Sequence, residues 1–195
     1  VERSRGLGDV YKRQKVMYVG MVPTDVVYTL SGIKNLPGLI ITASHNPSEY
    51  TGMKFCNAGA VAIGQETGLK EIQQIAENFN GNFVISDLPE KQIMNQIYLE
   101  HFKKIVDPAD ISDKVKFSID AGNGVLGAII DDLSDTFNLN FVGLYMDVDG
   151  SFPNHPADPS DENNLLDLKD KVISENLDFG VAFDGDADRL SLIHI

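Results

Sequence analysis

Residues 115–124 read VKFSIDAGNG, an alternating apolar segment that runs into a glycine turn. Helical spacing follows over about 125–137, a second strand pattern over 141–144, helical spacing over about 164–176 and a third strand pattern over 179–183. This strand–helix–strand–helix–strand order predicts a parallel α/β sheet. Ligands bind outside the carboxyl ends of such strands, so the loops at those ends are the candidate sites.

A second unit lies upstream, over residues 15–107. Its pattern predicts a helix capped near Thr24, a buried strand over 39–42, two strands around the turn 57–59, and amphipathic helices with their apolar residues between Leu69 and Phe79 and between Ile93 and Ile105. Pro108 and the polar residues after it mark the boundary. The sequence therefore divides into two consecutive α/β units, over 15–107 and 108–195.

The two ends of the chain differ from the rest. Residues 1–14 hold four of the 16 basic residues and show neither helical nor strand periodicity. They resemble translated adaptor sequence, and so does the stretch 190–195. We expect a non-native leader over 1–14 and a natural protein that begins earlier and ends later.

The composition excludes several classes of function. The chain has 195 residues, with 16 Lys and Arg against 29 Asp and Glu, and a formal net charge of −13. Such acidity argues against binding to nucleic-acid phosphates or to an anionic membrane surface. No apolar stretch approaches the roughly 20 residues of a membrane span. The single cysteine, Cys56, cannot form an internal disulfide, which favours a cytoplasmic location.

Three carboxylates alternate in the loop after the third strand of the sheet: Asp184, Asp186 and Asp188. Carboxylates this close repel one another, and a hard divalent cation such as Mg²⁺ relieves the repulsion. An EF-hand is excluded, because its sixth and twelfth positions need Gly and Glu and are here Arg189 and Ile195. A solvated acidic turn, or a phosphatase with Asp184 as its nucleophile, remains open.

The loop 42–47 follows the buried strand of the upstream unit and contains Ser44 and His45. A serine in this place is a candidate nucleophile or phosphate carrier, and the histidine is a candidate proton donor or anion ligand. No Gly-x-Ser-x-Gly surrounds Ser44, which argues against an α/β hydrolase. A plain turn with a surface histidine is the alternative.

The turn 122–127 has the spacing Gly-x-Gly-x-x-Gly between a strand and a helix, and Asp147 lies 20 residues beyond Gly127. This arrangement is typical of dinucleotide-binding sites. The same glycines also serve any tight strand-to-helix turn, so the spacing leaves both interpretations open.

Together, the segments 42–47 (TASHNP) and 183–189 (FDGDADR) resemble two motifs of the α-D-phosphohexomutases, in the same order. Further resembling segments lie at 20–24, 52–54, 120–124 and 149–159, so the resemblance covers about 15–190. Within this superfamily the sequence is most similar to the phosphomannomutase/phosphoglucomutase family. The resemblance implies a Mg²⁺-dependent isomerase that moves a phosphoryl group between the 6 and 1 positions of phosphorylated mannose or glucose. It also implies that the glycine turn is structural, and that the chain consists of two consecutive mixed or parallel α/β domains of the phosphohexomutase type, both incomplete.

The resemblance implies roles for individual residues. Ser44 matches the serine that gives its phosphoryl group to a hexose phosphate and receives the other one back from hexose 1,6-bisphosphate, the intermediate and activator. The Mg²⁺ ligands are implied to be a phosphoserine oxygen at Ser44 and the carboxylates of Asp184, Asp186 and Asp188. His45 and Lys54 match residues that line the reaction centre, with Lys54 as acid, base or charge stabiliser. Arg189 matches an arginine that approaches the phosphoserine or the substrate phosphate.

The family that the sequence resembles has four domains around a cleft. The resemblance places the loops that bind the sugar hydroxyls and the non-reacting phosphate in C-terminal domains that this sequence lacks. We therefore expect an N-terminal fragment that is inactive alone and whose partners are a phosphorylated hexose and the missing domains of the same chain. A phosphatase with an aspartyl nucleophile and a non-enzymatic cation-binding module remain the alternatives.

Overall fold

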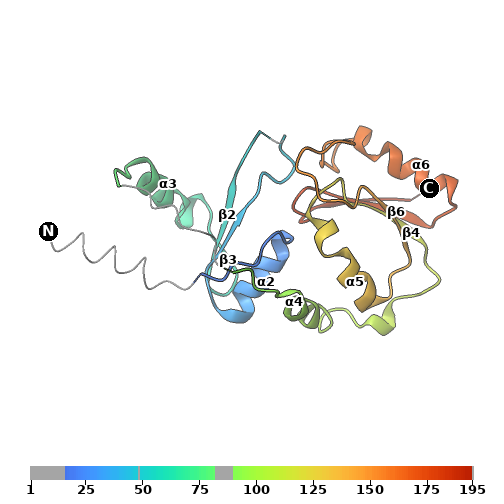
Figure 1. Ribbon diagram of the computed structural model, residues 1–195, viewed down its shortest axis with the longest axis horizontal. Helices are drawn as coiled ribbons and strands as arrows, with labels where there is room; N and C mark the ends of the chain where they lie inside the picture. Colours follow the sequence, from blue (N-terminus) through green and yellow to red (C-terminus); the bar gives the residue numbers. More distant parts are fainter. Residues whose placement is uncertain (1–15, 48, 82–89, 195) are drawn as a thin grey trace.

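The structure is a computed structural model that describes residues 16–47, 49–81 and 90–194. Its described helices are α2 (Thr24–Lys34), α3 (Leu69–Glu77), α4 (Asn95–Phe102), α5 (Ile130–Phe137) and α6 (Leu166–Ser174) (Figure 1). Its strands are β1 (Gly38–Ile41), β2 (Met53–Asn57), β3 (Val61–Ala62), β4 (Phe117–Asp120), β5 (Phe141–Leu144), β6 (Phe179–Phe183) and β7 (Leu190–Ile193). Four short 3-10 helices are η1 (Gln65–Thr67), η2 (Pro108–Asp110), η3 (Val125–Ala128) and η4 (Glu162–Leu165).

The larger sheet has the strand order β5-β4-β6-β7. Strand β4 pairs in parallel with both β5 and β6, which confirms the parallel α/β arrangement predicted from the strand and helix order. On one face, Ile119 of β4 packs in the same core as Ile130 and Phe137 of α5. On the other face, Ala182 of β6 packs with Leu168 of α6. The sheet is therefore covered on both faces, as parallel sheets require.

Strand β7 adds an antiparallel edge to this sheet. Its four residues pair with β6, with Phe183 opposite Leu190 and Gly180 opposite Ile193. The Ser191 hydroxyl also donates to the carbonyl of Pro159, at 2.5 Å. The stretch after Arg189, which resembles adaptor sequence, thus forms a strand of the sheet. The expected leader over 1–14 lies outside the described residues.

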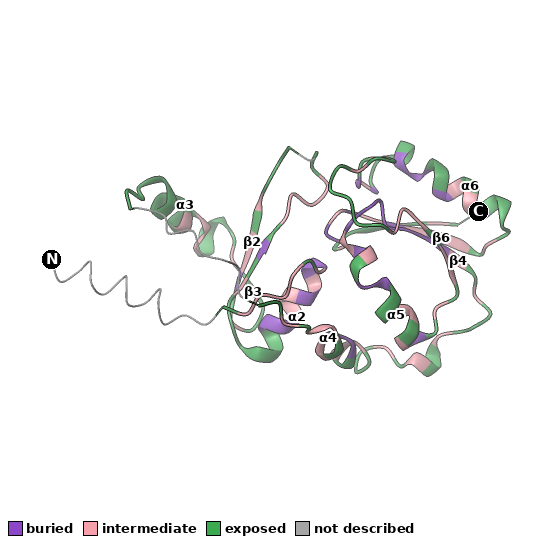
Figure 2. Cartoon of the chain, viewed as in Figure 1, coloured by how far each residue is buried: buried purple, intermediate pink, exposed green. Residues whose placement is uncertain are grey.

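The smaller sheet is antiparallel, with the order β1-β2-β3. The two strands predicted around the turn 57–59 form its β2–β3 hairpin. Helix α2 packs on the face where Ile40 and Cys56 are buried. The register places Leu39 and Ile41 on the other face, which is exposed in the described part of the chain (Figure 2).

The predicted helices exist, but the apolar spacing of two of them runs past their ends. Helix α2 begins at Thr24, close to the predicted cap, with Pro23 as its N-cap and no side-chain cap. Helix α3 ends at Glu77, so Phe79 lies beyond it. Helix α4 spans only Asn95–Phe102, so Ile93 and Ile105 lie outside it and are 82% and 69% exposed. Tyr98 and Leu99 of α4 are buried in the core that the helix shares with α2 and α5, and Phe102 packs against it. Apolar spacing thus continues past both ends of α4 to side chains that the core does not bury.

The upstream and downstream units share one hydrophobic core. One core joins Val26 of α2 and Tyr98 of α4 to Ile119 of β4 and Leu126 of η3. The backbone N–H of Thr24 also donates to the carbonyl of Asp186, at 3.1 Å. The start of α2 therefore lies against the loop that follows β6. Among the described helices, none has the length and apolar character needed to cross a membrane.

Candidate active site

The three predicted carboxylates converge after β6. One ligand oxygen from each of Asp184, Asp186 and Asp188 lies within 4.8 Å of the others. Asp184 is fully buried and Asp186 is 5% exposed. Burial raises the pKa of Asp184, and the charge of Asp186 raises it further, against the hydrogen bonds from Ser44 and Arg189. Buried carboxylates that repel one another are what a divalent cation stabilises.

Asp186 provides an observation that points to such a cation. Its Oδ1 is buried and has no hydrogen-bond partner among the residues that the structure describes. A buried acceptor without a partner costs about 1–3 kcal/mol, so native proteins rarely leave one. A cation held by all-oxygen ligands satisfies this atom, and the donor set therefore fits Mg²⁺.

Ser44 reaches this cluster from the other sheet. It follows β1 in a turn in which its own N–H donates to the Thr42 hydroxyl, at 2.8 Å. Its hydroxyl donates to Oδ2 of Asp184, also at 2.8 Å, across a separation of 140 residues. The φ of Ser44 is 55°, in the left-handed region that a side chain rarely adopts. Backbone strain of this kind costs about 1–3 kcal/mol and is typical of functional sites.

Gly185 allows the two loops to touch. A Cβ atom at this position would lie 2.5 Å from the backbone oxygen of Ser44, which no side chain tolerates. The glycine between the first two aspartates is therefore required by the close approach of the serine loop.

Lys54 of β2 provides the cationic side of the cluster. Its Nζ contacts Oδ2 of Asp186 and Oδ2 of Asp188, each at 2.6 Å. Partial burial acts to lower the pKa of Lys54, but the hydrogen bonds and charges of the two carboxylates outweigh it and raise that pKa. Burial likewise acts to raise the pKa of Asp186, yet hydrogen bonds from Lys54 and Thr24 lower it to about 2.

Arg189 connects the cluster to the serine loop. Its Nε donates to Oδ2 of Asp184 at 3.0 Å, while its Nη2 contacts both the Ser44 hydroxyl and Nδ1 of His45. Seven residues singled out from the sequence thus lie in one place: Ser44, His45, Lys54, Asp184, Asp186, Asp188 and Arg189. A guanidinium next to a serine hydroxyl is well placed to bind phosphoryl oxygens.

Thr24 is a site residue that sequence reasoning missed. Its hydroxyl donates to Oδ2 of Asp186 at 2.8 Å, and the residue is only 1% exposed. The sequence placed Thr24 at a helix start, where a hydroxyl is ordinarily explained as a cap. Only the packing of α2 against the acidic loop shows that the hydroxyl serves a carboxylate 162 residues away.

The glycine turn after β4 packs against the acidic loop that follows β6. The Val125 N–H donates to the carbonyl of Gly185 at 2.9 Å, and a Cβ on Gly124 would lie 3.0 Å from that carbonyl oxygen. A Cβ on Gly127 would lie 1.8 Å from the carbonyl oxygen of Met146. Close backbone packing therefore accounts for these glycines without a dinucleotide.

The geometry of Asp184 disfavours the aspartyl-phosphatase alternative. Oδ1 accepts from the N–H groups of Asp188 and Arg189, each at 3.0 Å, and Oδ2 accepts from Ser44 and Arg189. Both carboxylate oxygens are thus held by donors. A nucleophilic carboxylate needs an oxygen free to attack phosphorus.

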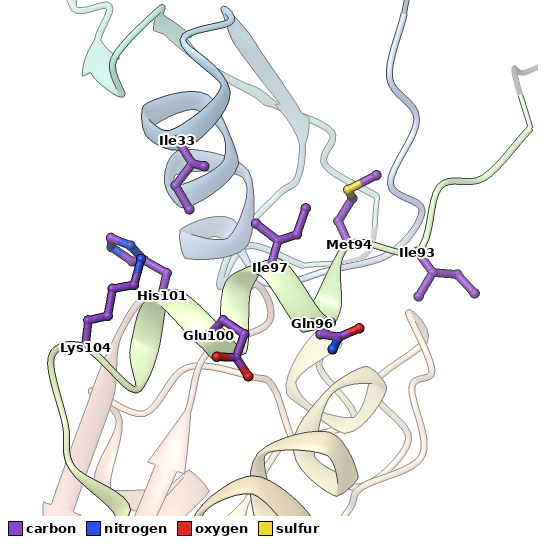
Figure 3. Close-up of a pocket in the computed structure, with 8 residues that line it drawn as sticks. All are labelled: Ile33, Ile93, Met94, Gln96, Ile97, Glu100, His101 and Lys104. Carbon is purple, nitrogen blue, oxygen red and sulfur yellow. The ribbon is translucent and has the colours of Figure 1, made fainter.

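A separate groove runs between α2 and α4, away from this cluster (Figure 3). Its lining is largely apolar with a few polar side chains: Ile33, Ile93, Met94, Gln96, Ile97, Glu100, His101 and Lys104. None of the seven predicted site residues lies in it. The groove is therefore separate from the candidate active site.

Comparison with protein families gives two matches. The phosphoglucomutase/phosphomannomutase alpha/beta/alpha domain I model matches residues 11–81, and the corresponding domain II model matches residues 96–194. The two matches together take in the serine loop and the acidic loop.

Individual proteins agree with these matches. The phosphomannomutase/phosphoglucomutase of Pseudomonas aeruginosa is 37% identical over 180 residues, which cover 92% of this chain and 38% of that protein. A phosphoglucomutase of Neisseria meningitidis serogroup A is 37% identical over 180 residues, covering 91% and 38%. The crystal structure of a phosphoglucomutase/phosphomannomutase family protein from Burkholderia thailandensis matches with a TM-score of 0.71 at 32% identity, covering 90% and 39%. The chain thus spans about 38% of the length of its curated relatives.

Proposed function

This chain belongs to the phosphoglucomutase/phosphomannomutase family, and from that premise we propose that it carries the phosphoserine and the metal ligands of a hexose phosphate mutase, an isomerase. The observation that carries the proposal is the 2.8 Å hydrogen bond from the Ser44 hydroxyl to Asp184. It joins the candidate phosphate carrier of one sheet to the candidate cation site of the other.

In the proposed reaction, Ser44 carries a phosphoryl group. The bond from phosphorus to the Ser44 oxygen breaks as a hydroxyl oxygen of the hexose phosphate bonds to phosphorus, and the hydroxyl proton passes to a neighbouring base. The product is a hexose 1,6-bisphosphate. Transfer of its other phosphoryl group back to Ser44 releases the isomerised hexose phosphate and restores the phosphoserine.

The carboxylates of Asp184, Asp186 and Asp188 hold Mg²⁺ in this proposal, together with a phosphoryl oxygen on Ser44. The unpartnered Oδ1 of Asp186 supports this assignment. When bound, the cation neutralises negative charge on the transferring phosphoryl group.

Three side chains act on the phosphoryl group and the proton. Arg189, which contacts the Ser44 hydroxyl and is partly exposed, orients the phosphoryl oxygens. Lys54, whose raised pKa keeps it charged at neutral pH, stabilises negative charge beside the acidic loop. His45, next to Arg189, lies where it can accept the hydroxyl proton.

Substrate and context follow from the relatives. Their names support phosphorylated mannose or glucose as the substrate class. We propose hexose 1,6-bisphosphate as the activator, because the reaction passes through it. Because the chain spans about 38% of those proteins, we expect Ser44 to accept a phosphoryl group but a full catalytic cycle to need further domains. We propose a domain boundary at residues 107–108 and, from the free thiol of Cys56, a cytoplasmic location.

Phosphate transfer to the protein tests the proposal directly. The chain is incubated with glucose 1,6-bisphosphate and Mg²⁺, and the modified residue is located by peptide mass spectrometry. We expect phosphate on Ser44, its loss in Ser44→Ala or in the presence of a chelator, and no change in Ser174→Ala, an exposed serine of α6. Phosphate on Asp184 would instead identify an aspartyl-phosphate phosphatase.

A further inference from the structure

We propose that His155 is a positioning residue for the Ser44 site, because its ion pair with buried Asp120 fastens the long loop between β5 and η4 onto the glycine turn that supports Gly185. The inference rests on the function proposed above. His155 has no contact with Ser44 or with the three aspartates among the interactions of the described residues. Its effect is therefore one of placement, not of chemistry on the substrate.

Asp120 anchors the arrangement at the end of β4. It is fully buried, and its Oδ1 accepts the N–H of Gly122 at 2.8 Å. Its Oδ2 lies 3.0 Å from Nε2 of His155, whose side chain is 13% exposed. Burial of an unpaired carboxylate costs free energy of folding. His155 provides the partner that offsets this cost for Asp120.

The partners of His155 define its protonation. Nδ1 lies 2.8 Å from the carbonyl oxygen of Pro156, which only accepts, and Nε2 lies 3.0 Å from Oδ2 of Asp120. These two oxygen partners favour the imidazolium form, in which both ring nitrogens donate. The hydrogen bond with Asp120 raises the pKa of His155 against the opposing effect of burial, and the Pro156 carbonyl and Asp167 raise it further.

The neighbourhood of the ring contains no opposing cation among the contacts of the described residues. Tyr145 meets the imidazole edge-on with ring centroids 5.3 Å apart, and its hydroxyl donates to Asp167 at 2.6 Å. The charged groups that face His155 are thus the carboxylates of Asp120 and Asp167. Both favour the protonated ring.

A chain of direct contacts leads from this pair to the site. Next to His155, the Asn154 amide donates to Oδ1 of Asn123 at 2.8 Å, inside the glycine turn. Two residues further, the Val125 N–H holds the carbonyl of Gly185 at 2.9 Å. Gly185 in turn lies so close to the Ser44 carbonyl that no Cβ fits between them. Loss of the His155 charge therefore loosens the support on which both site loops rest.

The sign of the pH dependence follows from the raised pKa. A histidine whose pKa is higher in the folded state stabilises the fold when it is protonated, and it loses that contribution as pH rises through the folded pKa. We therefore expect the loop to be held firmly below that pKa and less firmly above it. Catalytic sites that move by about 1 Å lose up to about 100-fold in rate.

The first experiment follows the apo protein by NMR. The pKa of His155 is measured from its ring resonances, and the backbone amides of Ser44 and Gly185 are followed over the same pH range. We expect both amides to titrate with the pKa of His155 in the wild type and not in His155→Gln. Amides that stay unmoved while His155 titrates would overturn the proposal, and this result needs neither a metal ion nor a folded variant.

The second experiment measures Mg²⁺ affinity by calorimetry, for the wild type, His155→Gln and the control His101→Gln on α4. We expect His155→Gln to bind about tenfold more weakly at a pH below the His155 pKa, and His101→Gln to bind as the wild type does. Equal affinity of all three proteins would contradict the positioning role. Absence of Mg²⁺ binding by the wild type would count against the proposed function only, because the NMR titration decides the role of His155 independently.

Discussion

Lys54 shows how much of the site depends on one side chain. Its ammonium group lies between Asp186 and Asp188 and compensates two carboxylates that would otherwise repel each other and the buried Asp184. Its position on β2 puts it on the same sheet as the serine loop. It therefore links the two sheets electrostatically, as Ser44 links them by a hydrogen bond.

Replacement of Lys54 by an uncharged residue tests whether Mg²⁺ can take over the stabilising effect of the lysine charge. We expect Lys54→Met to lower the free energy of unfolding by about 1–3 kcal/mol without Mg²⁺, because the buried carboxylate of Asp186 and the more exposed one of Asp188 lose their partner. We expect Mg²⁺ to restore more stability in the variant than in the wild type, since the cation replaces the lost charge. Thermal unfolding with and without Mg²⁺ measures both effects.

Lys70→Met is the matched control, because the exposed Lys70–Glu66 pair of η1 and α3 lies on the surface. Exposed pairs contribute about 0–1 kcal/mol, so neither its stability nor its response to Mg²⁺ should change appreciably. A Lys54 variant that responds to Mg²⁺ no more than this control would contradict the proposed cation site.

The lowered pKa of Asp186 predicts that the free energy of unfolding decreases in acid. Its folded pKa of about 2 lies below its ordinary value of 3.8, so it stabilises the fold above that value and loses the contribution as pH falls toward 2. The raised pKa of Asp184 acts in the opposite direction. We expect Asp186→Asn to remove up to about 2 kcal/mol of the acid-induced destabilisation, measured by urea unfolding between about pH 5 and 2.

The exposed Asp113 provides the comparison for this measurement. Asp113→Asn should follow the wild-type curve in acid. If Asp186→Asn also follows it, the carboxylate of Asp186 is not held in its ionised form by Lys54 and Thr24.

Among the elements, strands and helices were predictable where hydrophobic spacing is local. The β2–β3 hairpin, the parallel strands β4, β5 and β6, and the helices that cover them agree with their sequence patterns. Helix ends were less predictable, because apolar side chains such as Ile93 continue the helical spacing where no core remains to bury them. Strand pairing between β6 and β7 also had no local signal in the sequence.

The approach of the two site loops can be tested at Gly185. We expect Gly185→Ala to lower the free energy of unfolding by about 1–3 kcal/mol and to reduce the rate of Ser44 phosphorylation strongly, because the added Cβ meets the Ser44 carbonyl at 2.5 Å. Gly150→Ala is the matched control, since a Cβ there meets nothing within 4 Å. Equal phosphorylation rates in the two variants would contradict the close approach.

At the scale of the whole molecule, the site lies where two sheets meet. Ser44 and Lys54 come from the antiparallel sheet, and the three aspartates follow the parallel one. Helix α2 joins the two, since its first residue, Thr24, donates to Asp186 and its apolar face shares a core with β4. The relative placement of the two sheets is therefore what assembles the site.

The sequence alone determined the family resemblance, the α/β class and the seven residues that the structure brings together. Those features are local, because motif residues and hydrophobic periodicity depend only on near neighbours in the chain. Tertiary structure decided the contacts of Thr24, Gly185 and His155, since each meets a residue far away in sequence. Such contacts arise only when sheets and helices pack, and no spacing within a motif records them.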